Sequence, residues 1–417
     1  MSKQSTNQIT LDLLPLESET AFLIEPGVAT ATFFKASSFD EASSWLKEKY
    51  VKVLTANPWL AGRLIRPKGH KQVQLTYPQA LTDHHINELF HIQALQINST
   101  TPYATIYKTL TKNPATHIGP GLKLLNKDKP LASLAISQTN QDEFMVVFSV
   151  SHIIGDGATY YTLLNMILSD EAVVALNPKR DESYSTEKAM GKKDYRYLVG
   201  KLRTIKELFC WVFGPKSKVI AYTINDQAIA DTKAKLPKTA QVPFISTNDI
   251  ICSGFMRAIK SRLCLMAINY RGRYGKLNNQ HAGNYEGVVF YDQPVYQTPE
   301  GIRQSLQGDL PLTSHANPLP NTLETFSSRG GIITNWSSFA KDFKINQTYY
   351  DLHIPLLPLS LPSDAMVIFK CRPNTLAIMI LSKYHSFDYF VNNPQNPLSQ
   401  YLDQPISTAI FGQSAKS

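Results

Sequence analysis

The sequence has few cysteines and no long apolar run, and these absences exclude several classes of protein. The four cysteines among 417 residues form no Cys-x-x-Cys pair and no metal-ligand spacing, which argues against a disulfide-rich secreted module and against a zinc module. No run of eighteen apolar residues occurs, so no transmembrane helix is expected. The opening residues, MSKQSTNQ, lack the apolar stretch of a signal peptide. We therefore expect a cytoplasmic location.

The sequence also lacks a strong excess of charge of either sign. Its formal net charge is +9, and the basic residues are scattered without a recognisable nucleic-acid module, so no DNA or RNA partner is expected. A modest positive charge favours an anionic partner such as the phosphates of a nucleotide cofactor. The pair His84–His85 has no third ligand at a suitable spacing, so no metal site is predicted.

The length exceeds that of one typical hydrophobic core, so two domains are expected. A polar, charged stretch separates them, and we predict an N-terminal domain over 1–177, a crossover over 178–242 and a C-terminal domain over 243–417. Within the crossover, 195–213 has apolar residues at helical spacing. Packing against the core is the ordinary interpretation of such a helix, and peripheral contact with a membrane is the alternative.

The most informative stretch is 144–163, which reads FMVVFSVSHIIGDGATYYTL. Residues 144–150 are mostly β-branched or aromatic and carry no charge, which is typical of a strand buried on both faces. The Gly-Asp-Gly sequence at 155–157 indicates a sharp turn, and 158–168 has the apolar spacing of a helix. His152 therefore lies where a buried strand ends, and we expect it to face a cleft.

The spacing of this segment is His-x-x-x-Asp-Gly, formed by His152, Asp156 and Gly157. A fixed imidazole with a pKa near neutrality can act as a general base on a hydroxyl or an amine. The alternative is a core histidine beside an ordinary turn. The buried strand before His152 and the glycine after Asp156 favour the catalytic interpretation.

This segment resembles the active-site motif of the CoA-dependent acyltransferase superfamily, which includes BAHD acyltransferases, chloramphenicol acetyltransferase and the condensation domains of peptide synthetases. Many members have a second histidine before the catalytic one, and this chain has Ser151 there. The difference counts more against condensation domains than against the BAHD group. The Asp-Phe-Gly-Trp-Gly motif of most plant members is also missing, which argues against close kinship with them.

Three further segments, in the same order as in BAHD enzymes, extend the resemblance. Ser246 and Thr247 open a predicted helix, and the resemblance implies that they bind CoA, although capping the helix would explain them equally well. Arg271, in an expected Asn-x-Arg-x-Arg strand before Gly-Asn, is implied to pair with Asp156. Thr334 and Trp336 match a Thr-x-Trp segment on the acceptor side of the channel, where they are candidate oxyanion donors.

The resemblance implies a mixed α/β fold, with two chloramphenicol-acetyltransferase-like domains, helices flanking mixed sheets, and an active-site channel at their interface. It implies an enzyme that moves an acyl group from acyl-CoA to the hydroxyl or amine of a small molecule, with no permanently bound cofactor and no covalent intermediate. A monomer is expected. Two alternatives stay open: a condensation-type enzyme that uses a carrier-protein thioester, and a non-catalytic acyl-CoA-binding relative.

Overall fold

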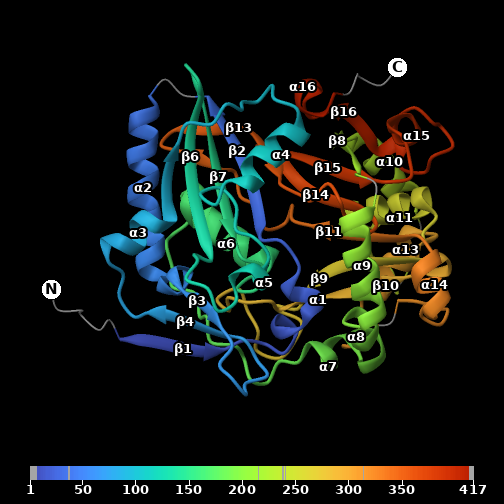
Figure 1. Cartoon of the computed structure of the whole chain (residues 1–417). Coiled ribbons are helices and arrows are strands. Elements are labelled where there is room, and N and C mark those ends of the chain that lie inside the picture. The colour runs from blue at the N-terminus through green and yellow to red at the C-terminus, as the bar shows by residue number, and fades with distance from the viewer. Residues whose placement is uncertain are drawn as a thin grey trace.

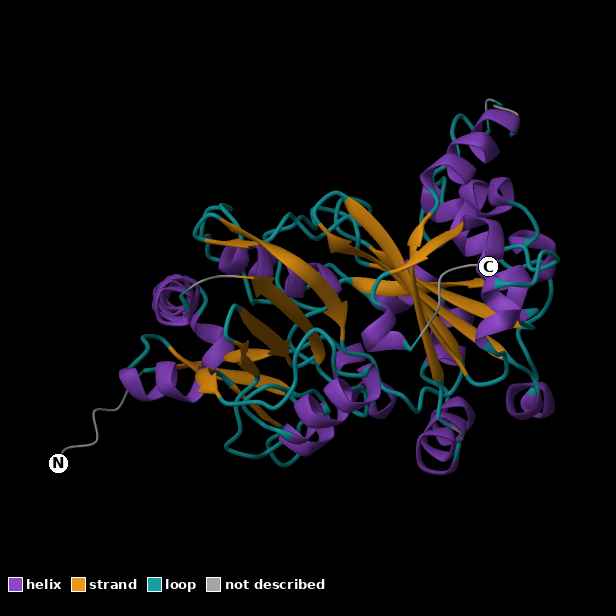
Figure 2. Cartoon of the chain, turned by 90° about the horizontal axis from the view of Figure 1, so that it is seen from above, coloured by secondary structure: helices purple, strands orange, loops and turns teal. Residues whose placement is uncertain are grey.

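Two large mixed sheets lie side by side in the computed structural model of the chain, each with helices packed around it (Figures 1 and 2). The structure describes residues 7–35, 38–214, 216–236, 239, 241–312 and 314–412. The start of the chain, from which a missing signal peptide was inferred, lies mostly outside these residues.

The first sheet is built around the predicted buried strand. Its six strands run in the order β12 (Lys344–Ile345), β13 (Thr348–Pro355), β2 (Val28–Lys35), β7 (Glu143–Val150), β6 (Ala132–Asn140) and β5 (Phe90–Gln93). All eight residues of β7 are buried, because the strand is central in the sheet and is covered on both faces. β6 and β7 form an antiparallel hairpin that leads to His152.

The second sheet has seven strands. Their order is β10 (Glu286–Tyr291), β9 (Leu263–Asn269), β11 (Gly330–Asn335), β14 (Asp364–Arg372), β15 (Thr375–Ser382), β8 (Lys218–Ile224) and β16 (Leu402–Pro405). β11 runs parallel to both of its neighbours, and the other pairs are antiparallel. A small antiparallel sheet of β1 (Gln8–Asp12), β4 (Gln74–Pro78) and β3 (Arg63–Ile65) lies beside the first sheet.

Membership of the two large sheets does not follow the predicted domain boundaries. β8 belongs to the second sheet although it lies inside the predicted crossover, and β12 and β13 belong to the first sheet although they come from the C-terminal segment. In Figure 1, β13 is an orange strand beside the blue strand β2. The two halves of the chain therefore exchange an element. This exchange could not be predicted, because hydrophobic patterning does not specify which strand pairs with which.

The helix expected over 158–168 and the helix expected to open at Ser246 and Thr247 are both present. Asp156 caps α6 (Gly157–Leu168), and Ser246 caps α11 (Thr247–Ile259). The remaining helices are η1 (Leu16–Ser18), α1 (Thr20–Leu23), α2 (Phe39–Ala56), η2 (Pro58–Ala61), α3 (Asp83–Leu89), α4 (Tyr103–Lys112), α5 (Gly121–Leu124), α7 (Thr186–Met190), α8 (Lys192–Leu198), α9 (Lys201–Phe213), α10 (Asp226–Lys235), α12 (Gln293–Tyr296), α13 (Pro299–Ser305), α14 (Thr322–Ser327), α15 (Phe387–Val391), η3 (Ser399–Tyr401) and α16 (Thr408–Phe411).

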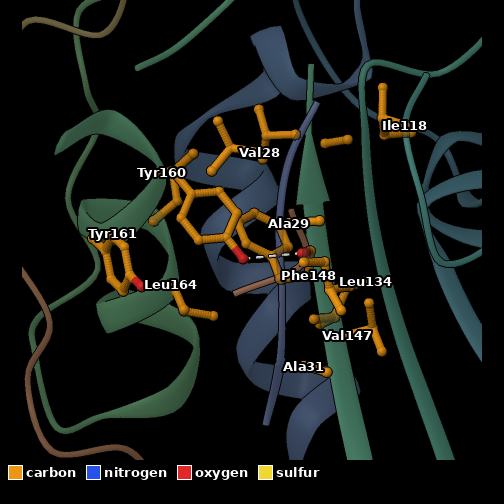
Figure 3. Close-up of a cluster of buried hydrophobic side chains, with 14 of the residues drawn as sticks. Val28, Ala29, Ala31, Ile118, Leu134, Val147, Phe148, Tyr160, Tyr161 and Leu164 are labelled. Atoms are coloured by element: carbon orange, nitrogen blue, oxygen red, sulfur yellow. Dashed lines mark hydrogen bonds between the residues drawn. The ribbon is translucent and has the colours of Figure 1, made fainter. Parts of the chain in front are cut away.

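The core behind the segment that carries His152 is formed by β7, β2 and α6 (Figure 3). The ring of Tyr160 on α6 stacks on Phe148 of β7, and its hydroxyl donates to the Phe148 carbonyl oxygen at 2.9 Å. The same hydroxyl lies 2.7 Å from the hydroxyl of Thr30. These contacts fix α6 on the sheet, and the turn between β7 and α6 is therefore held at both ends.

The segment 195–213 differs from its prediction. It is split into α8 and α9, and the large apolar side chains of α9 are exposed rather than packed in a core: Leu202, Ile205, Leu208, Phe209, Val212 and Phe213. The opposite side of α9 packs against α14 and against α1. The predicted amphipathic pattern is present, but its widest apolar face points to solvent.

None of the helices in the described residues is both long enough and apolar enough to cross a membrane.

Candidate active site

His152 lies directly after β7, at the end of the strand nearest the second sheet. The edge of the Phe22 ring packs against the imidazole, with 5.0 Å between ring centroids. The side chain of His152 is 18% exposed, and its Nε2 atom lies on a cavity of about 220 Å³ between the two large sheets. A rigid strand therefore presents one imidazole nitrogen to an enclosed space.

The other ring nitrogen of His152 has a fixed partner, Asn284. The amide nitrogen of Asn284 donates to the backbone oxygen of His152 and to Oε1 of Glu17, both at 2.8 Å. Its Oδ1 atom is therefore the one that faces His152 Nδ1, at 3.2 Å, and an amide oxygen only accepts. In the neutral imidazole the proton therefore lies on Nδ1, and the lone pair of Nε2 is directed at the cavity.

Glu17 and Arg180 hold Asn284 in this orientation, and sequence reasoning missed both. The Glu17 side chain is fully buried and forms an ion pair with Arg180 at 2.9 Å. It also accepts from the backbone N–H of Asn284 at 3.0 Å. No local motif marks Glu17 or Arg180, because the pair joins segments that are 163 residues apart. Asn284 was visible in the sequence as part of a Gly-Asn match, but it was given no role.

Asn284→Ala should lower kcat by roughly tenfold or more, because it frees the imidazole to rotate and to take the other tautomer. Binding of the substrates should change little, since Asn284 does not line the cavity. Steady-state kinetics and a melting curve measure both quantities. A control is Asn87→Ala, an exposed change on α3. Wild-type turnover in a folded Asn284→Ala protein would contradict the orienting role.

Asp156 points away from the cavity and pairs with Arg271, at 2.7 Å between Oδ2 and a guanidinium nitrogen. Both side chains are at most 2% exposed. The carboxylate also accepts from the backbone N–H groups of Thr159 at 2.8 Å and Tyr285 at 3.0 Å. A carboxylate satisfied in this way joins the α6 turn to the second sheet, and it has no free oxygen for a substrate.

Arg271 and Arg273 lie outside the strand that was predicted for them. β9 ends at Asn269, and the two arginines follow in the turn, where Arg271 also donates to the carbonyl oxygens of His281 and Gly283. The side chain needs this position because a strand residue could not reach several carbonyl groups of the opposite loop. Arg273 is exposed and lines a second cavity of about 340 Å³.

Thr334 and Trp336 lie between the two cavities. Both line the cavity of His152 and the second one, and so does Gly157. The indole of Trp336 lies over Gly157, where a Cβ atom would be only 3.3 Å from Nε1. Among the described residues, no group accepts a hydrogen bond from that Nε1. The indole N–H is thus a donor without a partner at the junction of the cavities.

Ser246 and Thr247 are already engaged in local hydrogen bonds. The Ser246 hydroxyl accepts from the backbone N–H of Asp249 at 3.2 Å and from Arg303 at 2.8 Å. Thr247 accepts from Lys233 at 3.1 Å. Neither lines the two cavities, whereas Asn248, on the first turn of the same helix, does line the second. The structure thus shows their capping role and leaves CoA contact as a proposal.

Two carboxylates that sequence reasoning also missed face His152. Nε2 lies 3.7 Å from Oε1 of Glu286 and 3.9 Å from Oε2 of Glu25. Burial lowers the pKa of His152, but the two carboxylates raise it by more, so that it lies above its ordinary value. Burial raises the pKa of Glu286 to about 7, and it also raises the pKa of Glu25. The three groups lie close enough to influence one another's protonation.

Where the structure describes the chain, no group of three or more His, Cys, Asp or Glu side chains could hold a metal ion.

Comparison with known proteins shows the fold through structures alone. No protein family model and no curated protein matches this sequence. Among solved structures, F. graminearum TRI101 complexed with coenzyme A and deoxynivalenol is 13% identical, with a TM-score of 0.63 over 94% of this chain and 99% of that one. TRI3 trichothecene 15-O-acetyltransferase from Fusarium sporotrichioides is 10% identical, with a TM-score of 0.61 over 96% and 97%.

The first condensation domain of the CDA synthetase is also similar, with 12% identity and a TM-score of 0.55 over 91% of this chain and 93% of that one. These proteins share the chloramphenicol-acetyltransferase-like fold. The chain therefore has this fold over nearly its whole length, and the predicted pair of mixed sheets flanked by helices is confirmed.

Proposed function

We propose that this protein is an acyltransferase that moves an acyl group from acyl-CoA to a hydroxyl or amine of a small molecule. The observation that carries the proposal is the state of His152: its Nδ1 proton is held by Asn284, and its Nε2 lone pair faces the cavity between the sheets. A fixed, neutral imidazole facing an enclosed space is the arrangement that a general base requires.

In this mechanism His152 Nε2 removes the proton of the acceptor as the acceptor attacks the thioester carbonyl carbon. The carbonyl oxygen then becomes an oxyanion, and the unpartnered N–H of Trp336 and the hydroxyl of Thr334 are its donors. Collapse of the tetrahedral intermediate breaks the C–S bond. The proton on His152 passes to the CoA thiolate, so that the imidazole is neutral again for the next turnover.

Asp156 and Gly157 shape the turn that holds His152 and take no part in proton transfer. Asp156 is saturated by Arg271 and two backbone N–H groups, and Gly157 leaves room for the indole of Trp336. Replacement of Gly157 by a larger residue would press on the indole. The two residues therefore act through geometry.

CoA would enter from the second cavity, and the acceptor from the cavity of His152. The second cavity is lined by Asn248 and by Arg273, and the exposed guanidinium of Arg273 suits the phosphates of the cofactor. Ser246 and Thr247 stay in the proposal as residues that approach CoA at the start of α11. The acyl-CoA is a cosubstrate, and the chemistry requires no permanently bound cofactor.

Release of the CoA thiol tests the proposal directly. The purified protein is mixed with acetyl-CoA or longer acyl-CoAs and with a panel of alcohols and amines, and the free CoA thiol is followed over time. A rate that depends on both the acyl-CoA and the acceptor supports the proposal. A protein that binds CoA and releases no thiol with any acceptor would instead be the non-catalytic relative considered above.

A carrier-protein thioester is the second candidate donor, and the likeness to a condensation domain keeps it open. The same assay distinguishes the two donors if acetyl-phosphopantetheinyl carrier protein replaces acetyl-CoA. Ser151 in place of a second histidine favours CoA, because that histidine belongs to the condensation-domain pattern that the resemblance carries.

Trp336→Phe should lower kcat by roughly tenfold to a hundredfold, because phenylalanine keeps most of the ring area and removes one oxyanion donor while Thr334 remains. The KM for acyl-CoA should hardly change. Steady-state kinetics in both substrates measures the two constants. Unchanged kcat with a lower melting temperature would assign Trp336 to packing, and a rise in that KM alone would place it against CoA.

We also propose a monomeric, cytoplasmic protein with a peripheral membrane contact through α9. The four cysteines are free thiols, as in a reducing compartment. The exposed face of α9 includes Phe209, Val212 and Phe213, at 62%, 69% and 72% exposure, which is unusual for a helix in contact with water alone. Gel filtration measures the oligomeric state, and co-sedimentation with anionic vesicles measures the membrane contact.

A further inference from the structure

Glu25 and Glu286 line the cavity of His152, but the transfer of an acyl group to an alcohol does not require either carboxylate. The walls of this cavity are otherwise mostly apolar, from Phe22, Val28 and Ile332 among others. Over the described residues, neither carboxylate receives a hydrogen bond, and His152 is the one ion-pair partner of each. Arg203 acts on Glu25 and Arg271 acts on Glu286 only at longer range. A carboxylate beside apolar walls is costly unless a cation or a donor satisfies it.

The remaining charges around the cavity leave these two carboxylates uncompensated. Arg203 and Glu207, both on α9, line the same cavity, and they pair with each other at 2.8 Å. Asp156 is paired with Arg271 behind the turn. Among the described residues, neither Glu25 nor Glu286 has an ion-pair partner other than His152, and the space between them and Nε2 suits a cation.

We propose that the acceptor is an amine that binds as its ammonium ion between Glu25, Glu286 and His152, with a compact apolar body in the rest of the cavity. This inference rests on the proposed acyltransferase function and names its acceptor class. The volume of about 220 Å³ limits that body to a small group.

The proton balance explains why an amine uses groups that an alcohol does not. A primary alkylamine resembles the lysine side chain, whose pKa is about 10.4, and it therefore arrives protonated. One proton passes from the ammonium to a cavity carboxylate, which frees the nitrogen lone pair. The neutral amine attacks the thioester carbon, and His152 takes a second proton as the C–N bond forms.

The reaction then ends as for any acceptor: the C–S bond breaks, the proton on His152 passes to the CoA thiolate, and the products are an amide and free CoA. The proton on the carboxylate is released to solvent. An alcohol arrives neutral and loses one proton only, so His152 alone would serve it. Two proton acceptors beside the attacking atom match the two protons that an ammonium must lose.

The test compares amines with alcohols of the same carbon skeleton: butylamine with butanol, hexylamine with hexanol, and phenethylamine with phenethyl alcohol. Thiol release from acetyl-CoA gives kcat/KM for each, in the wild type and in the double variant Glu25→Gln/Glu286→Gln. The control variant is Glu48→Gln, which removes an exposed carboxylate on α2. Calorimetric titration of each amine and alcohol into the CoA-bound proteins measures binding apart from turnover.

The amine-to-alcohol ratio of kcat/KM should fall at least roughly tenfold in the double variant and stay constant in Glu48→Gln, because only the amine loses a charged partner. If the carboxylates only shift the pKa of His152, the amine-to-alcohol ratio of kcat/KM stays constant in both variants. Only the pH dependence of kcat/KM then changes in the double variant. That outcome, or the lack of any amine that binds more tightly than its alcohol, overturns the inference.

The proposed function can fail separately. If alcohols are acylated and amines are not, acyl transfer stands and the amine inference falls. If the protein neither binds CoA nor releases thiol with any acceptor, the acyltransferase proposal fails and takes the inference with it.

Discussion

His152→Ala should lower kcat by roughly a hundredfold or more, the scale of a lost general base. Nε2 of the imidazole faces the first cavity, and Asn284 maintains the orientation of the ring through Nδ1. Without it, the proton of the acceptor must pass to water or to a carboxylate that is not aligned for the attack. The dissociation constant of CoA should change little.

Because the alanine leaves a space beside Phe22, folding must be checked with a second variant. His152→Gln retains most of the volume and can still contact Asn284, and it should lose activity to a similar extent with a nearly unchanged melting temperature. His70→Ala, in an exposed loop, is the control for histidine removal as such. Near-wild-type turnover in both His152 variants would contradict the proposed role of His152 as the general base.

Asp156→Ala should destabilise the fold by roughly 3–5 kcal/mol, because it leaves the buried guanidinium of Arg271 without its carboxylate. The loss includes the N-cap of α6 and the link to the backbone of Tyr285. Activity should fall in parallel, since the same turn positions His152. Urea unfolding measures the stability, and thiol release measures the activity.

The double variant Asp156→Ala/Arg271→Ala should be less destabilised than the sum of the two single changes, because it contains no unpaired buried charge. The exposed pair Lys179–Glu182 provides the control: Glu182→Ala should cost at most about 1 kcal/mol. Fully additive losses at Asp156 and Arg271 would mean that their ion pair contributes nothing in solution.

The sequence was sufficient for the parts of the site that lie on one continuous segment. The strand before His152, the turn at Asp156 and the helix after Gly157 follow from local patterning, and the structure has all three. The nearness of Thr334 and Trp336 to His152 came from the resemblance, because no local rule connects segments that are so far apart.

The groups that were missed all act between segments that are far apart in the sequence. Glu17 and Arg180 orient Asn284, and Glu25 and Glu286 face Nε2, yet each looks like an ordinary polar residue in its own segment. Their roles depend on which segments the fold brings together. The amphipathic pattern of α9 shows a similar limit: the periodicity predicted the helix and could not say whether its apolar face meets a core or solvent.

The exchange of β13 between the halves of the chain has a consequence for the design of chimaeras and fragments. β2 is paired with β7 on one edge and with β13 on the other. A fragment that stops at residue 177 would therefore leave that second edge of β2 unpaired, and an exposed strand edge promotes aggregation. One half of the chain therefore cannot be exchanged between homologues by joining two sequences at a single position. A chimaera must take residues 344–355 from the same parent as the N-terminal half, and it must take β8 from the same parent as the C-terminal half.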